Sequence, residues 1–242
     1  MKTKAIIFGI GMVISMASST AKDLADDLNH PQVSSSIGKV LDNEGNEYRT
    51  VTIGEQTWLA DNLRTTKFQD GSKVSTGYIP DDDDSNLLRY GRLYDWNDVS
   101  DNRNICPAGW RVATDEDWQT LERAIGIDES ELNTIGWRGK NDIAIELKAE
   151  QPNTLFKNFD QSRVNKFSFS ATPAGIKLGK SYVGNWYITQ GMFTEFWTSS
   201  NASEKEAFVR TLAYSWWNPN KGKIRRATLD KSYMFSVRCV KI

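Results

Sequence analysis

Only two cysteines occur in the 242 residues, Cys106 and Cys239, and they decide much of what this chain can become. Two thiols are too few for a four-cysteine metal site. In an oxidising compartment an even number of cysteines predicts a disulfide instead. Such a bond would tie the end of the chain to its middle and close a loop over more than half of the sequence. Two free buried thiols are the alternative.

The N-terminal segment indicates that the compartment is an oxidising one. Residues 1–21 begin with Lys2 and Lys4, continue with an apolar stretch and end in small residues up to Ala21. This order is typical of a secretory signal peptide, and the apolar stretch is short for a permanent membrane anchor. We therefore expect an exported protein, located in the periplasm, at the cell surface or outside the cell, with Cys106 joined to Cys239 and no transmembrane segment.

Residue counts exclude several classes of function. The single histidine, His30, falls within residues 22–37, a polar stretch that we expect to be a flexible lead-in. Its position leaves the main domain without Ser–His–Asp triads, Cys–His pairs or multi-histidine zinc sites. The 30 basic and 31 acidic residues create no net field that would attract nucleic acid. We expect no nucleic-acid partner.

Residues 38–242 are expected to form one α+β domain of short, mostly antiparallel strands with two or three helices in the middle of the chain. The clearest helix starts after Thr114, with Asp117 completing a capping box and Gly126 ending it. Two further helices are expected over 128–135, with Leu132 and Ile135 facing inward, and over 142–149. The expected strands are 39–41, 48–53, 57–59, 167–171, 185–189, 195–199, 207–214, 223–229 and 233–240.

Six strings in this region occur in a characteristic order. They are TVTIGEQTWLADNL (50–63), YGRLYDWNDV (90–99), CPAGWRVATDEDWQTL (106–121), FSATPAGIKL (169–178), FWTSS (196–200) and SVRCV (236–240). Together they resemble the Fibrobacter succinogenes major paralogous domain family of exported bacterial proteins, over about residues 38–242. The resemblance implies a C-type-lectin-like fold and no established activity.

Tryptophans fall into two groups with different expected roles. Five lie inside the strings above and are expected in the core: Trp58, Trp96, Trp110, Trp118 and Trp197. Trp216 and Trp217 are adjacent, and neighbours in a strand face opposite sides, so at least one is expected at the surface. We regard Trp216 and Trp217 as candidate ligand-binding residues that could stack on a sugar ring or a partner chain. Packing under the neighbouring loop is the equally weighted alternative.

Two acidic clusters need a chemical interpretation. The run Asp81, Asp82, Asp83 and Asp84 could hold Ca²⁺ through oxygen ligands, but the EF-hand spacing is absent and a solvated loop is favoured. Asp115, Glu116 and Asp117 could suggest the paired carboxylates of a glycosidase, but the helix start explains them. We therefore expect no catalytic residue, no metal site and no cofactor, with calcium as the one ion to test.

These observations favour a secreted, non-catalytic recognition or cell-surface assembly domain whose partner is a glycan or a cell-surface protein. A secreted carbohydrate-active enzyme that uses paired carboxylates and a purely structural envelope protein are the alternatives. A cleft with two acids would favour the enzyme, and an open aromatic surface would favour binding.

Overall fold

In the computed structural model of the chain, residues 37–150, 159–179, 187–215 and 217–242 are described. The expected signal peptide (1–21) and all but the last residue of the expected lead-in (22–37) lie outside these ranges. The strands are β1 (Gly38–Leu41), β2 (Glu47–Ile53), β3 (Gln56–Leu59), β4 (Trp110–Val112), β5 (Gly136–Arg138), β6 (Ile176–Lys177), β7 (Tyr187–Ile188), β8 (Phe193–Asn201), β9 (Glu206–Ala213), β10 (Ile224–Asp230), β11 (Ser236–Val237) and β12 (Cys239–Lys241). The α-helices are α2 (Leu87–Tyr90), α3 (Trp96–Ser100) and α4 (Asp115–Ala124). The 3₁₀ turns are η1 (Pro80–Asp82), η2 (Asp84–Asn86), η3 (Glu129–Glu131), η4 (Ile143–Leu147) and η6 (Gln161–Arg163).

The strands form two five-stranded sheets and one small ribbon. The first sheet has the order β1-β2-β3-β12-β4, the second has the order β11-β8-β9-β10-β5, and β6 pairs with β7. Strand β11 runs parallel to β8, and the other pairings between these strands are antiparallel. The described residues thus confirm the expected α+β class. The longest helix described, α4, has ten residues and could not cross a membrane.

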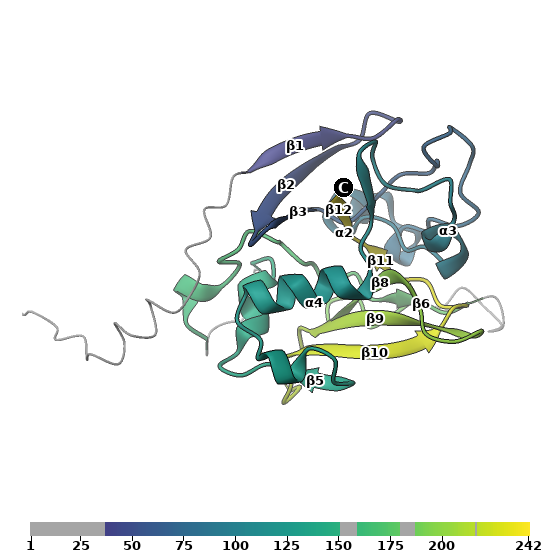
Figure 1. The fold of residues 1–242 in the computed structure, drawn as a ribbon. Helices are drawn as coiled ribbons and strands as arrows, with labels where there is room; N and C mark the ends of the chain where they lie inside the picture. The colour runs from purple at the N-terminus through teal and green to yellow at the C-terminus, as the bar shows by residue number, and fades with distance from the viewer. Residues whose placement is uncertain (1–36, 151–158, 180–186, 216) are drawn as a thin grey trace, which may run out of the picture. The chain divides into compact units, whose positions relative to one another are not determined.

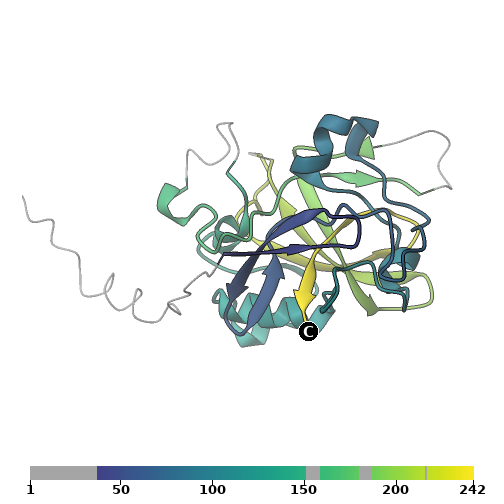
Figure 2. The same ribbon diagram turned by 90° about the horizontal axis from the view of Figure 1, so that it is seen from above.

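The C-terminal segment joins the two sheets. Strand β11 belongs to the second sheet and β12 to the first, and the chain passes between them at Arg238. Figure 2 shows the yellow C-terminal strand beside the blue strands of the N-terminal sheet. Cys239 of β12 is bonded to Cys106, with their Cα atoms 6.0 Å apart, which confirms the predicted disulfide. This bond secures β12 to the loop that leads into β4.

Helix α4 covers one face of the second sheet (Figure 1). It begins as the sequence predicts: the Asp117 backbone N–H donates to Thr114 Oγ1 at 3.1 Å, and the Thr114 N–H donates to the Asp117 carboxylate at 2.7 Å. Gly126, with φ of 102°, follows its last turn. The capping box accounts for the position of Asp117.

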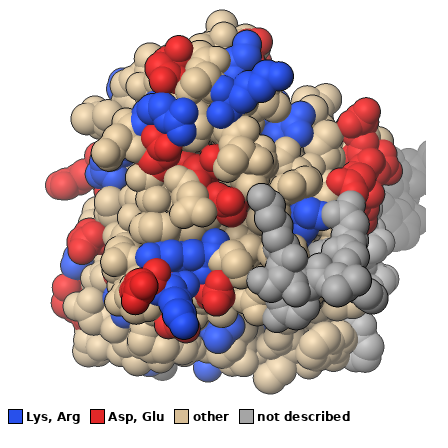
Figure 3. Space-filling view, turned by 90° about the vertical axis from the view of Figure 1, so that its right-hand side faces the viewer, with Lys and Arg blue, Asp and Glu red and all other residues tan. Residues whose placement is uncertain are grey.

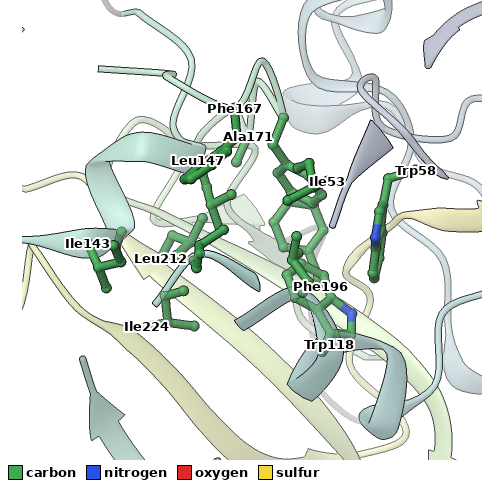
Figure 4. Packing of buried hydrophobic residues seen from close by; sticks show 14 of the residues in the cluster. Ile53, Trp58, Trp118, Ile143, Leu147, Phe167, Ala171, Phe196, Leu212 and Ile224 are labelled. Atoms are coloured by element: carbon green, nitrogen blue, oxygen red, sulfur yellow. The ribbon is translucent and has the colours of Figure 1, made fainter. Parts of the chain in front are cut away.

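Aromatic rings fill the space between the helix and the two sheets. Trp118 of α4 contacts Trp58 of β3 with ring centroids 5.2 Å apart and Phe196 of β8 with centroids 5.4 Å apart (Figure 4). Phe169 adds an edge-to-face contact to each tryptophan. Four of the five tryptophans expected in the core are buried: Trp58, Trp110, Trp118 and Trp197. The fifth, Trp96, is half-buried and donates its indole N–H to the Thr198 carbonyl.

A network of buried charges also holds α4 on the sheet. Arg210 of β9 donates to Asp115 and to Glu122 of α4, each at 2.7 Å. Arg226 donates to the other oxygen of Asp115 at 2.7 Å, and Arg138 pairs with Glu122 at 2.8 Å. The helix-capping interpretation of the three acids is therefore incomplete. Asp115 is a buried ion-pair partner whose position depends on strands more than ninety residues away.

Several expected elements are wrong. Residues 128–135 form only the 3₁₀ turn η3, and although Leu132 is buried, Ile135 is 57% exposed because the chain turns directly into β5. The helix expected over 142–149 is the shorter turn η4. The strand expected over 167–171 is a loop with a single bridge, Lys148 to Ala171. The strand expected over 233–240 is split into β11 and β12 by the crossing at Arg238.

Candidate functional site

Arg238 is fully buried at the point where the chain crosses between the sheets. Its Nε donates to Asn62 Oδ1 at 2.8 Å, and Nη1 donates to the Leu59 and Phe169 carbonyls at 2.8 and 2.7 Å. Nη2 donates to the Ser170 carbonyl at 3.1 Å. Three of the six strings that carry the family resemblance, 50–63, 169–178 and 236–240, therefore meet at one guanidinium.

The charge on Arg238 is balanced by dipoles rather than by a bonded carboxylate. Its four hydrogen-bond acceptors are three backbone carbonyls and one side-chain amide oxygen. The Phe169 ring lies 4.5 Å from the guanidinium carbon and adds a cation–π contact. Burial lowers the pKa of Arg238 to about 9, and attraction to Asp61 opposes the change. The group therefore stays charged at neutral pH and fixes the segments around it.

The loop that Arg238 holds has a strained backbone. Asn165, Ser168 and Ser170 all have positive φ angles, of 52°, 55° and 53°, although none is a glycine. Asn165 stabilises this conformation, since its Oδ1 accepts the Ser170 N–H at 2.8 Å and its Nδ2 donates to Ser170 Oγ at 3.0 Å. Strain that the surrounding structure maintains in this way is concentrated at functional sites.

This loop forms one wall of a pocket of about 360 Å³, which we call the Arg238 pocket. Its lining side chains are mostly polar: Arg49, Asp61, Asn62, Arg89, Glu150, Asn165, Ser170 and Thr172, with Leu88 and Ala149 as the apolar members. Arg238 lies behind the wall, because it bonds Asn62 and Ser170 directly. The volume is within the range of small-ligand sites.

The polar groups of the pocket are positioned before any ligand enters. Asn62 is buried, with its Nδ2 donating to the Tyr90 carbonyl at 2.8 Å and to Ser236 Oγ at 3.2 Å. Arg49 holds Asp61 through Nη2 to Oδ1 at 2.6 Å and through its own backbone N–H at 2.8 Å. Burial alone would raise the pKa of Asp61, but the hydrogen bonds from Arg49 outweigh it and lower that pKa. Asp61 is therefore an ionised acceptor in a fixed orientation.

The described ligand-binding candidate from the sequence, Trp217, is not part of this lining. Trp217 is 57% exposed, so one of the two adjacent tryptophans does reach the surface, and Trp216 lies outside the described residues. Trp217 is not among the residues that line the Arg238 pocket, and its role in binding stays a prediction. The pocket itself was not predicted from the sequence. The signal available there was the adjacent polar pair Asp61-Asn62, which follows a buried strand.

The Asp81–Asp84 run is an exposed loop around the turns η1 and η2. All four side chains are exposed, Asp83 accepts the Ser85 N–H at 2.9 Å, and Asp82 accepts a hydrogen bond from the Tyr187 hydroxyl. Within the described ranges, no group of three or more His, Cys, Asp and Glu side chains is arranged to hold a metal ion. These hydrogen bonds are sufficient to explain the orientation of the Asp82 and Asp83 side chains.

Glu195 of β8 is a second titratable group in an unusual environment. It is 9% exposed, and its Oε2 has no hydrogen-bond partner in the described part of the chain. Burial raises the pKa of Glu195 to about 8, although Arg225 attracts the ionised form. A carboxyl group in this setting is protonated at neutral pH.

We expect the pH dependence of stability to report this group. Because the folded pKa exceeds the unfolded value of about 4.5, the contribution of Glu195 is fully present below pH 4.5 and is lost as the pH rises through 8. Glu195→Gln should match the wild type at pH 5 and should be more stable by about 2–4 kcal/mol at pH 9. Urea unfolding at both pH values checks this, with exposed Glu204→Gln as control. The prediction would be contradicted if the free energy of unfolding changed equally between pH 5 and pH 9 in Glu195→Gln and in Glu204→Gln.

Comparison with known proteins adds one match. No curated protein and no solved structure matches this chain. The Fibrobacter succinogenes major domain, in contrast, matches residues 51–241. That range includes most of the residues that line the Arg238 pocket as well as Arg238 and both cysteines. The chain therefore belongs to the Fibrobacter succinogenes major domain family.

Proposed function

We propose that the protein is an exported, non-catalytic recognition domain with a C-type-lectin-like fold, which binds a glycan in the Arg238 pocket. The observation that carries this proposal is the character of the lining: eight of its ten side chains are polar, and those on the wall are held by a buried guanidinium. Sugar hydroxyls both donate and accept hydrogen bonds, and the pocket offers amide, hydroxyl, carboxylate and guanidinium groups. Fixed polar groups bind with little loss of side-chain entropy.

The ionised state of Asp61 argues against its acting as a general acid. A general acid needs a carboxyl group that is protonated near the working pH. The Asp61 carboxyl group is instead ionised, because the hydrogen bonds from Arg49 lower its pKa. Export of the domain is supported by the Cys106–Cys239 disulfide, since such bonds persist in oxidising compartments.

A carbohydrate-active enzyme is the second candidate, and one observation favours it. Glu150 and Asp61 line the same pocket, so two carboxylates could flank a bound glycosidic bond. The two functions differ in what Glu150→Gln does. A binding domain does not hydrolyse the sugar with or without this change, whereas in an enzyme the change abolishes hydrolysis.

The test is titration of the mature chain with short neutral cello-, xylo-, manno- and chito-oligosaccharides, with and without calcium. For the sugar that binds, Thr172→Val and Glu150→Gln should each weaken affinity about tenfold, the effect of a lost hydrogen bond of roughly 1.4 kcal/mol. Glu204→Gln, on the exposed turn between β8 and β9, should leave affinity unchanged.

Two results would overturn the proposal. One is the absence of binding to all four sugar series at millimolar concentration. The other is release of shorter sugars by the wild type that stops in Glu150→Gln, which would establish the enzyme.

A further inference from the structure

A second pocket, of about 580 Å³, opens at the edge strand β5 of the second sheet. Its lining includes Trp137, Lys140 and Asn141 from β5 and the following loop, and Lys223, the residue before β10. It shares no lining residue with the Arg238 pocket. We propose that this pocket binds an acidic sugar, with Trp137 as the stacking surface and Lys140, Lys223 and Arg225 as the groups that attract its acid.

The register of the sheet places the aromatic ring and the cations together. Trp137 of β5 lies directly opposite Arg225 of β10, and side chains of directly opposed residues project from the same face. Lys223 precedes Arg225 by two residues and lines the same pocket as Trp137. The half-buried Trp137 ring is therefore flanked by an arginine of the neighbouring strand β10 and by the lysine that immediately precedes this strand.

These cations are available to a ligand. Lys140 and Lys223 are exposed, and within the described ranges the side chain of neither forms a hydrogen bond or an ion pair. Arg138, which also lines the pocket, is committed to Glu122. Glu131 is the one acid of the lining, and it accepts the Gly139 N–H at 2.7 Å. The free charge at the mouth of the pocket is therefore positive.

The side chain of Arg225 also has no hydrogen-bond or ion-pair partner among the described residues. One strand-borne carboxyl group, that of Glu195, lies two strands away on the same face of the sheet. The register continues from Arg225 to Thr211 of β9 and from Thr211 to Glu195 of β8. Thr211 Oγ1 and Glu195 Oε2 are buried without partners in this part of the structure. No hydrogen bond joins Arg225 to Glu195, so its guanidinium can serve a ligand at Trp137.

The chemistry of the pocket selects one class of ligand. An indole face stacks on the C–H surface of a sugar ring, and ammonium and guanidinium groups pair with carboxylate or sulfate. Nucleic acid would need an extended basic surface. The face shown in Figure 3 instead has small, interspersed groups of both signs, in keeping with a net charge of −1. Three cations around one ring suit a single acidic sugar unit.

Titration with oligogalacturonate, dextran sulfate oligomers and neutral dextran oligomers tests this proposal. We expect the wild type to bind an acidic series and not neutral dextran, with affinity that falls as salt rises. Trp137→Ala should lose at least tenfold in affinity, while Trp137→Phe, which keeps a ring, should lose less than threefold. The double variant Lys140→Ala, Lys223→Ala should lose at least tenfold and flatten the salt dependence. Preference for oligogalacturonate or for dextran sulfate identifies carboxylate or sulfate as the acid.

Matched controls separate this site from the rest of the molecule. Lys205→Ala removes an exposed lysine outside the pocket lining and should leave the affinity unchanged. Thr172→Val removes a polar group of the Arg238 pocket and should also leave it unchanged, so this test can fail independently of the proposed function. The proposal is overturned if no acidic series binds at low salt, if neutral dextran binds equally well, or if Trp137→Ala binds like the wild type while folded.

Discussion

Replacing both Cys106 and Cys239 by serine should lower the free energy of unfolding by about 4–5 kcal/mol at most. The bond closes a loop of more than a hundred residues, so the unfolded chain gains a large conformational freedom when it is absent. Residual structure in the unfolded state and changes in the folded state reduce the value. Urea unfolding of the wild type, the double variant and the reduced wild type measures it.

The reduced wild type is the matched control for this experiment. It keeps both cysteine side chains and loses only the bond, so its unfolding midpoint should agree with that of the double serine variant. A double variant as stable as the oxidised wild type would show that the crosslink contributes nothing.

Replacing Arg210 by methionine should destabilise the domain by about 3–5 kcal/mol. Methionine fills a similar volume, but the change removes a hydrogen-bonded partner from two buried carboxylates at once, Asp115 and Glu122. Attraction to Arg226 and Arg138 remains, so the loss comes from charge that stays buried with fewer donors. Urea unfolding at pH 7 measures the change.

Arg123→Met on α4, the helix that carries Asp115 and Glu122, is the control. Arg123 also makes a two-point ion pair, with Glu129 at 2.7 and 2.8 Å, but both side chains are half or more exposed. An exposed pair contributes about 0–1 kcal/mol. Equal losses in Arg123→Met and Arg210→Met would mean that burial does not determine the contribution of these pairs.

Elements that depend on local chemistry were predictable from the sequence. The β1–β2 hairpin follows from a turn rich in Asp, Asn and Gly, and α4 follows from the Thr114–Asp117 capping box. The disulfide was predictable because the two cysteines of a chain that is expected to be exported have one possible partner each. None of these inferences needed knowledge of distant contacts.

The Arg238 pocket was not predictable, for a physical reason. Residues 167–171 alternate apolar and polar side chains, which indicates a strand, yet Ser168 and Ser170 adopt positive φ angles that no strand contains. What holds them there is a guanidinium 68 residues further along the chain, together with Asn165. Periodicity describes a segment and its immediate neighbours, so it cannot register a conformation that a distant side chain imposes.

The position of β12 has a consequence for the time course of folding. This strand, Cys239–Lys241, lies almost 180 residues after β3 in the sequence but occupies an inner place in the first sheet, between β3 and β4. Until β12 pairs with them, β3 and β4 each have an unpaired edge. The sheet whose first strand begins at residue 38 is therefore complete only when the segment around residue 240 has joined it. Pairings between such distant segments are slow to form, because the entropy of loop closure is lost before contacts compensate for it. Completion of the N-terminal sheet is thus a late event, and a chain that passes through a narrow channel from its N-terminus would be unable to close that sheet until β12 had emerged.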